Sequence, residues 1–373
     1  DFYYAPPSGY LALCTDNLPD PDIALPGENF NTIIWSGSGA GSGGGTAGNR
    51  ALTGVGFQPD LVWGKQRTDQ TNYPNILVDS VRTAPWQIYS NSTSIQYEGD
   101  AAGNLASLDS DGFSTTEGAA GNLYWNRSGS TFVAWNWKAG TTFDPTTDGS
   151  IASATGKSNS TAGFSIVKYT AENAVKTIGH GLSQAPTLIL QKTLVSGQWE
   201  CYYLRGDGSD GVIFLDQNGA GEAAGIGYWN DTNPTPSVFT VGTGGGTGGG
   251  TDDHIAYCFH SVEGYSKVGS YTGNGNADGI FVYCGFRPAY LMIKRTDASK
   301  NWFIHDDKRS TYNVIDGETL KANTNGAEVS DTGAAMDFVS NGFKQRTSDD
   351  GYNDGTFLYL AFASHPFKTA NAR

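Results

Sequence analysis

The stretch GVGFQPDLVWGKQR, residues 54–67, decides the fold, because the chain writes its pattern again in two other places. A close copy, YCGFRPAYLMIKR, occupies residues 283–295. Both copies hold a Gly–Phe pair, a Pro two residues after the Phe, and a Lys six residues after the Pro. A looser copy, GLSQAPTLILQK, occupies residues 181–192 and keeps the six-residue interval between Pro186 and Lys192. The pattern predicts an internal repeat.

Each copy predicts a short strand that is covered on both faces. Gly allows a backbone turn that a Cβ would resist, and Pro fixes φ at the first residue of a strand, where a missing N–H costs least. The runs that follow, at residues 60–63 and 290–293, are short, rich in β-branched or aromatic side chains, and free of helix caps. Such runs are typical of buried strands.

The composition indicates an all-β protein. The 373 residues include 51 Gly for turns, and 12% of the chain is aromatic. No stretch of twelve residues combines helical apolar spacing with freedom from Gly and Pro. Turn-forming Gly together with strand-forming aromatics favours sheets over helices.

The charge balance argues against two classes of partner. The net charge is −14, and the Lys and Arg residues form no patch, so nucleic acid is not expected as a partner. No run of eighteen apolar residues exists, so no membrane span is predicted. The chain starts at Asp1 without Met or a signal-peptide pattern, and we expect a fragment or a processed product.

The order of the predicted strands divides the chain into an arm and repeats. Residues 1–29 are rich in Pro and are expected to form an extended arm. Repeats are predicted at 30–140, 163–264 and 265–373, with a linker at 141–162. The Gly-rich stretches 36–48 and 242–250 are interpreted as flexible loops. Each repeat holds six or seven short strands, which predicts three tandem antiparallel β-sandwiches. A single body with pseudo-threefold symmetry is the alternative.

No catalytic site, metal site or cofactor is predicted from the histidines or cysteines. None of these residues has a partner at the spacing that metal ligands require, and no CxxC pair occurs. A small buried thiol is the interpretation for Cys258 and Cys284, and a structural role is the interpretation for His180, while a disulfide between any two cysteines stays open. The histidines and cysteines are His180, His254, His260, His305, His365, Cys14, Cys201, Cys258 and Cys284.

Acidic pairs in Gly- or Ser-rich loops allow three interpretations. Two carboxylates could cleave a glycosidic bond, and a loop such as DSDG at residues 109–112 could bind Ca²⁺. The third interpretation is that Asp makes the hydrogen bonds of the turn itself, which is its usual role in such loops. The continuation FSTTEG lacks the remaining calcium ligands, so the turn interpretation is favoured.

Two Trp–Asn pairs are the candidate ligand-binding residues. Trp125 and Trp229 each precede an Asn shortly before the end of a repeat, and Trp86 also lies in a loop-like stretch. A flat exposed ring with polar neighbours can stack on a sugar. Packing between strands is the competing interpretation for these rings.

Several longer phrases resemble a family of bacteriophage structural proteins, frequent among aquatic and cyanobacterial phages. The phrases are TGVGFQPDLVWGKQR, LDSDGFS, TFVAWNWKAG, TAGFSIVKYT, IGHGLSQAP, VEGYSKVGSYTGNGNADGIFVYCGFRPAYLMIKRTDASKNW and LYLAFASHPFK. In that family the region commonly follows a SPRY-like or lectin-like sandwich, which is absent here. The resemblance implies a virion or tail-fibre-like protein and supplies no catalytic residues.

We therefore expect a non-enzymatic phage virion protein of a tail fibre or a capsid-surface appendage. Its expected partners are copies of itself, other virion proteins and a host-surface glycan. A glycan-binding receptor module that uses Trp125 or Trp229 is the first alternative, and a polysaccharide-cleaving tailspike is the second.

Overall fold

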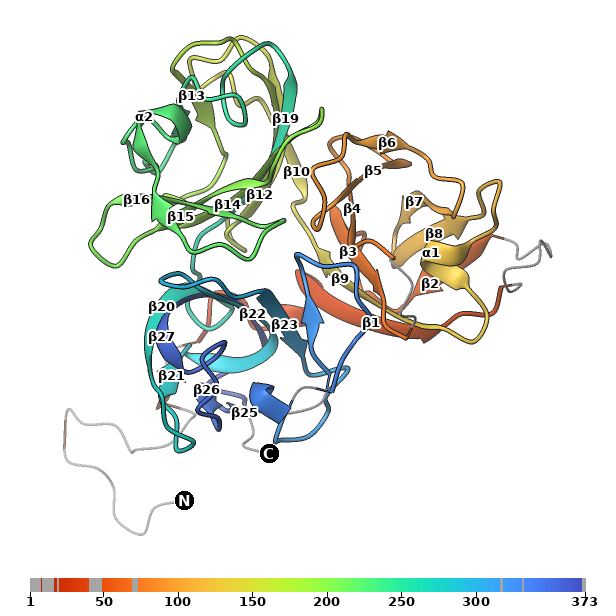
Figure 1. The fold of residues 1–373 in the computed structure, drawn as a ribbon, viewed down its shortest axis with the longest axis vertical. Helices are drawn as coiled ribbons and strands as arrows, with labels where there is room; N and C mark the ends of the chain where they lie inside the picture. The colour runs from red at the N-terminus through yellow and green to blue at the C-terminus, as the bar shows by residue number, and fades with distance from the viewer. Residues whose placement is uncertain are drawn as a thin grey trace.

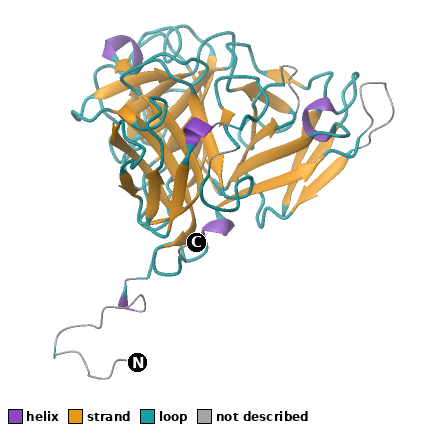
Figure 2. Ribbon diagram, turned by 60° about the horizontal axis from the view of Figure 1, so that its bottom comes forward, coloured by secondary structure: helices purple, strands orange, loops and turns teal. Residues whose placement is uncertain are grey.

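The computed structural model describes residues 8, 17–18, 20–39, 49–68, 73–315, 318–330 and 332–370. Nearly every regular element in these residues is an antiparallel strand, which confirms the all-β prediction (Figure 2). The helical elements are single turns: η2 (Pro26–Glu28), α1 (Leu123–Asn126), α2 (Gly225–Tyr228) and η3 (Thr332–Ala334). Within the described part, no helix has the length and apolar character needed to cross a bilayer.

Lobe 1, residues 30–137, contains a large sheet and a small sheet. The large sheet has the order β1-β9-β3-β4-β5-β6, and the small sheet has the order β2-β8-β7. The strands are β1 (Phe30–Ser36), β2 (Arg50–Thr53), β3 (Leu61–Gln66), β4 (Ile76–Asp79), β5 (Trp86–Tyr89), β6 (Tyr97–Glu98), β7 (Asn104–Asp109), β8 (Gly112–Thr116) and β9 (Thr131–Trp137).

Lobe 2, residues 141–259, has a large sheet of order β10-β11-β12-β19-β14-β15-β16-β17 and a small sheet of order β13-β18. The strands are β10 (Thr141–Phe143), β11 (Ala154–Asn159), β12 (Phe164–Thr170), β13 (Lys176–Gly179), β14 (Leu188–Thr193), β15 (Glu200–Leu204), β16 (Asp210–Phe214), β17 (Glu222–Ala223), β18 (Val238–Val241) and β19 (Asp253–Phe259).

Lobe 3, residues 266–366, has a large sheet of order β20-β27-β22-β23-β24 and a small sheet of order β21-β26-β25. The strands are β20 (Ser266–Asn274), β21 (Phe281–Tyr283), β22 (Phe286–Arg295), β23 (Trp302–Asp306), β24 (Leu320–Lys321), β25 (Met336–Val339), β26 (Gly342–Gln345) and β27 (Asp354–Pro366).

The three large sheets share one strand order. In each lobe the opening strand (β1, β12 or β20) pairs with the closing strand (β9, β19 or β27). The closing strand also pairs with the strand that contains the patterned Lys (β3, β14 or β22). The register also agrees, because Lys65, Lys192 and Lys294 lie opposite Val133, Ile255 and Leu358. Residues that occupy the same place in this register are called equivalent below.

The interpretation of residues 141–162 as a linker is corrected. Strands β10 and β11 lie in this stretch, and β11 extends the large sheet of lobe 2 by pairing with β12. The low hydrophobicity that suggested a linker is explained by partial exposure, because only one of the six residues of β11 is buried. The sequence ATGKSN of β11 is polar for this reason.

The Gly-rich stretch 242–250 is also corrected, because it is anchored. Tyr169 Oη donates to Thr247 O at 2.8 Å, and Gln191 Nε2 donates to Gly246 O at 2.8 Å. A Cβ at Gly242 would lie 2.1 Å from the backbone oxygen of Ile226, and a Cβ at Gly248 would lie 2.2 Å from Gly242 O. Gly is therefore needed here for close packing. Most of the other Gly-rich stretch, residues 40–48, lies outside the described residues.

Each lobe has a core between its two sheets, and a further core joins the lobes. Figure 1 shows the three lobes, coloured orange, green and blue, around a common centre. The faces of the large sheets that point to this centre form one apolar cluster, the central cluster. The central cluster supports the alternative prediction, a single body with pseudo-threefold symmetry, over three separate sandwiches. Its members from the closing strands are Val133, Trp135, Trp137, Ile255, Tyr257, Phe259, Leu358, Leu360 and Phe362.

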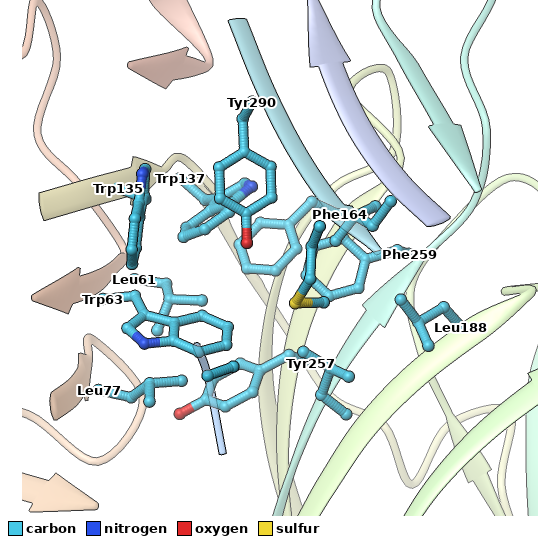
Figure 3. Packing of buried hydrophobic residues seen from close by; sticks show 14 of the residues in the cluster. Leu61, Trp63, Leu77, Trp135, Trp137, Phe164, Leu188, Tyr257, Phe259 and Tyr290 are labelled. Carbon is cyan, nitrogen blue, oxygen red and sulfur yellow. The ribbon is translucent and has the colours of Figure 1, made fainter. Parts of the chain in front are cut away.

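Aromatic rings fill the middle of the central cluster. The ring of Tyr290 lies edge-on to the rings of Trp135 and Trp137, with centroids 5.7 and 5.8 Å apart (Figure 3). The rings of Phe164 and Phe259 stack at 5.0 Å in the same cluster. Edge-on and offset pairs of this kind add to the energy of burial. The lobes therefore share a packed core.

Candidate functional site: the junctions between the lobes

The repeated Lys lies one residue before the end of each patterned strand. Its side chain reaches across the junction between two lobes. Lys65 Nζ of lobe 1 donates to Asn325 O of lobe 3 at 2.9 Å. Lys192 Nζ of lobe 2 donates to Thr93 O of lobe 1 at 3.4 Å. Lys294 Nζ of lobe 3 donates to Asn218 O of lobe 2 at 3.2 Å. Each ammonium thus fastens its own lobe to a loop of the next in a cyclic order.

These ammonium groups are buried. Lys192 and Lys294 are 0% exposed, and Lys65 is 2% exposed. Each also donates to a carbonyl of its own lobe, at Tyr73, Gly197 and Lys300. Burial disfavours the charged form of an amine. It lowers the pKa of Lys65 and Lys294 to about 7 and the pKa of Lys192 to about 8.

A backbone hydrogen bond next to each Lys repeats the same cycle. Arg67, Leu194 and Thr296 are equivalent, each two residues beyond the patterned Lys. Their carbonyl oxygens accept N–H groups from the neighbouring lobe. The donors are Glu328 to Arg67 at 2.8 Å, Gln96 to Leu194 at 3.1 Å and Gly221 to Thr296 at 2.8 Å.

Each junction also contains a hydrogen bond from a side chain of one lobe to a backbone carbonyl of the next. Trp199 Nε1 donates to Tyr89 O, and Trp302 Nε1 donates to Phe214 O, both at 2.9 Å. In the third junction Asn75 Nδ2 donates to Lys321 O at 3.2 Å. Buried donors that find a partner only across a junction favour one arrangement of the lobes, because separation would leave them unpaired.

The junction between lobes 1 and 2 holds a buried ion pair. Arg82 Nε lies 2.7 Å from Asp79 Oδ2, and both side chains are at most 1% exposed. Tyr257 Oη of lobe 2 donates to the same carboxylate oxygen at 2.8 Å. A closing-strand side chain of one lobe thus satisfies a charge of the next.

The junction between lobes 3 and 1 holds the equivalent pair. Arg309 Nε lies 2.6 Å from Asp306 Oδ2, and both side chains are fully buried. Trp135 Nε1 of lobe 1 donates to Asp306 Oδ2 at 2.9 Å. Glu328 then bridges Arg309 at 2.6 Å and Arg67 at 2.7 Å. This junction therefore carries the most charge.

The junction between lobes 2 and 3 has an apolar version of the same contact. Register places Tyr203 where the other lobes have Asp79 and Asp306, because these residues lie opposite Leu188, Leu61 and Tyr290. The position of Tyr257 and Trp135 is taken by Leu360 in lobe 3. Both Tyr203 and Leu360 belong to the central cluster. The acceptor and the donor are therefore missing together.

The structure buries both candidate ligand-binding residues. Trp125 and Trp229 are each 1% exposed. Trp125 packs edge-on to Phe113, and Trp229 packs edge-on to Tyr202. A ring that stacks on a sugar needs an open face. The burial is inconsistent with the stacking hypothesis for these two residues and favours the packing interpretation.

The acidic loop residues make hydrogen bonds and ion pairs with the chain itself. Asp111 accepts the N–H groups of Gly54 and Gly56 at 3.1 and 2.6 Å, and so holds the turn of the opening sequence pattern. Asp253 pairs with Lys168, and Asp350 pairs with Lys300 at 2.5 Å. Among the described residues no group of three or more His, Cys, Asp or Glu is arranged to hold a metal ion.

The described cysteines and four of the five histidines, His180, His254, His260 and His305, are buried, whereas His365 is exposed. Cys201, Cys258 and Cys284 carry free thiols, and Cys14 lies outside the described residues. Burial raises the pKa of Cys258 and of Cys284 to about 12. His180 Nδ1 accepts the N–H of Leu182 at 3.2 Å, while its Nε2 lies 3.0 Å from Thr235 O. Both ring nitrogens therefore serve the local backbone.

The sequence indicates the two buried ion pairs only through a four-residue pattern. In each case an Asp at the end of a strand is followed three residues later by Arg, as DSVR at 79–82 and DDKR at 306–309. Sequence reasoning missed them because such spacing is common in turns. The cross-lobe donors Tyr257 and Trp135 give no local signal.

The fold and its junctions define an all-β protein of three lobes around a shared core. The sequence of residues 25–366 matches the family described as a domain of unknown function, DUF7483, and the chain belongs to that family. No curated protein and no solved structure matches the chain.

Proposed function

We propose that the protein is a non-enzymatic structural component of a virus particle, part of a tail fibre or a capsid-surface appendage. The observation that carries the proposal is how the chain uses its charged and aromatic groups. The buried Lys, the Asp–Arg pairs and the central rings all join one lobe to another. These contacts suit a rigid building block. The particle itself is proposed from the resemblance of the repeat sequences to phage structural proteins.

The net charge of −14 fits a protein that is displayed on a surface. A large net charge opposes nonspecific association and favours solubility. Self-association and contact with other particle proteins then need specific surfaces. Contact with a host-surface glycan remains part of the proposal, without Trp125 or Trp229 as the stacking rings.

The proposal is tested on particles purified from cultures of a virus that encodes this chain. Mass spectrometry of the particles, with gold-labelled antibody against the chain, should find the protein at a regular position on the exterior. An excess of the protein in the soluble lysate, with none in the purified particles, would overturn the proposal. A reducing-sugar assay on host polysaccharide should detect no release, and release by the pure protein would favour the tailspike alternative.

A further inference from the structure

Strands β1 and β12 open lobes 1 and 2 at equivalent positions but differ at their outer edges. Phe30 lies opposite Trp137, and Phe164 lies opposite Phe259, which makes Thr32 equivalent to Ile166. The outer edge of β12 pairs with β11. Strand β1 is the outermost strand of its sheet within the described residues. An unpaired strand edge is a template for another strand.

In lobe 2 the added strand is held by its backbone and by one side chain. Lys157 of β11 lies opposite Ile166. Its ammonium crosses to lobe 1 and lies 2.9 Å from Asp60 Oδ1. The other oxygen of Asp60 accepts the N–H groups of Ala139 and Gly140 at 2.9 and 2.7 Å. The carboxylate thus fixes where β11 sits.

The junction of lobes 3 and 1 presents a carboxylate at the equivalent place. Ser80 N donates to Asp60 O at 2.8 Å, and Asp307 N donates to Ala289 O at 2.9 Å, so Asp307 stands where lobe 1 has Ser80. Here a groove of about 270 Å³ lies open, and Thr32, Ala289, Asp307, Lys308 and His365 are among its lining residues. No strand occupies it in the described part of the chain.

Two oxygens at this groove are buried without a hydrogen-bond partner among the described residues. Arg287 Nη1 lies 3.0 Å from Asp307 Oδ2, which leaves Asp307 Oδ1 unpaired. The hydroxyl of Thr32, a residue that is 4% exposed, is also unpaired. Buried polar atoms without partners are costly, so both oxygens favour a ligand that carries a hydrogen-bond donor.

The backbone of β1 has further hydrogen-bonding groups that a partner strand can use. Asn29 O and Gly37 N bond toward β9, and alternation then directs the N–H and C=O groups of Thr32 and Ile34 to the outer edge. Asn31 Oδ1 accepts the N–H of Thr32 at 2.9 Å, so this N–H has a hydrogen-bond partner in the absence of another strand. Ile34 is 45% exposed on this strand.

We propose that the outer edge of β1 binds an extended strand of a partner chain, antiparallel to β1, with a donor side chain that reaches Asp307 Oδ1. The expected sequence of the bound strand follows the segment ATGKSN of β11, which pairs with the equivalent edge of β12 and carries Lys as the donor. A Glu at the same position is disfavoured, because two carboxylates would meet. The proposal rests on the proposed function only for the origin of the partner, a neighbour in an assembly.

The test uses the full chain and a labelled synthetic peptide of residues 153–160, SATGKSNS, titrated to millimolar concentration by fluorescence anisotropy. We expect saturable binding and slower amide hydrogen exchange at Ile34. Replacing Lys by Glu in the peptide should weaken binding at least fivefold. The variant Ile34→Pro should weaken it at least tenfold, because Pro removes the outward N–H. Pro is tolerated on an edge strand, and a thermal unfolding curve confirms that the variant is folded.

Absence of saturable binding to the wild-type protein would overturn the proposal. Equal affinity for wild type and folded Ile34→Pro would also overturn it, since the peptide would then bind elsewhere. Both outcomes are independent of whether the protein is found on particles. Failure of this inference and failure of the proposed function can therefore be told apart.

Discussion

The junctions of this protein solve one packing problem in two ways. Between lobes 1 and 2, and between lobes 3 and 1, a buried Asp–Arg pair accepts a hydrogen bond from an aromatic residue of the next lobe. Between lobes 2 and 3, Tyr203 and Leu360 take these places. The comparison teaches that acceptor and donor change together, because either one alone would leave a buried polar group unpaired.

The largest effect is expected from breaking the charged junction of lobes 3 and 1. The variant Asp306→Ala leaves Glu328 as the counter-charge of the buried Arg309 and takes the acceptor from Trp135. We expect a loss of about 3–5 kcal/mol in the free energy of unfolding, as for other buried ion pairs that lose one partner. Urea unfolding followed by tryptophan fluorescence measures it. A loss below about 1 kcal/mol would show that this pair does not hold the lobes.

A smaller effect is expected when only the hydroxyl of Tyr257 is removed and its ring is kept. Tyr257→Phe removes the bond to Asp79 and should cost about 1.5–3 kcal/mol, the range for hydrogen bonds to charged groups. The matched control is Tyr290→Phe, because Tyr290 is equally buried and its hydroxyl has no hydrogen-bond partner among the described residues. The control should be neutral or slightly stabilising. Equal losses in the two variants would contradict the role of the Tyr257 hydroxyl.

The buried Lys is the feature that all junctions share, and its effect depends on pH. The pKa of Lys65 and of Lys294 is about 7 in the folded protein, while an unfolded Lys has a pKa near 10.4. Between these values the unfolded state binds more protons, so the free energy of unfolding should rise with pH. Below pH 7 both states are protonated and this contribution is flat.

Lys294→Met should reduce that rise by about 1 kcal/mol per pH unit between pH 7.5 and 9.5, since one proton corresponds to roughly 1.4 kcal/mol per unit. Urea unfolding at several pH values gives the slope. Lys308→Met is the control, because Lys308 is exposed and should leave the slope unchanged. An unchanged slope in Lys294→Met would mean that this ammonium is not desolvated.

The smallest effect is expected at an acidic loop. Asp207 lies in a Gly- and Ser-rich loop, and its carboxylate is 61% exposed and lies 3.7 Å from Arg205. Asp207→Asn should leave the midpoint of thermal unfolding almost unchanged, because exposed ion pairs contribute little to stability. A thermal scan measures the midpoint. A clear decrease would show that the loop has a structural role beyond its turn.

Composition was sufficient to predict an all-β chain, and the repeated Gly–Pro–Lys pattern predicted the place of each patterned strand. The pattern also marked Lys65, Lys192 and Lys294, although their role was not foreseen. Local sequence cannot show which lobe satisfies a buried charge, and so the bond from Trp135 to Asp306 was not predicted. The same limit left two interpretations open for Trp125 and Trp229, stacking on a sugar and packing between strands. Their burial is decided by the opposite sheet, not by the loop around them.

The polar strand β11 was taken for a linker for a related reason. Its composition is that of a loop, and only pairing with β12 makes it a strand. The anchored Gly-rich stretch 242–250 shows the opposite case. Its glycines are required by close contact with the backbone, as at Gly242 against Ile226 O, and composition alone suggested mobility.

The central claim is that the lobes form one cooperative body through the central cluster and the cyclic junctions. Differential scanning calorimetry tests it directly through the ratio of the calorimetric to the van't Hoff enthalpy of unfolding. A single transition with a ratio of about 1 is predicted. A ratio of about 3, or three resolved transitions, would contradict the claim, because the lobes would then unfold independently.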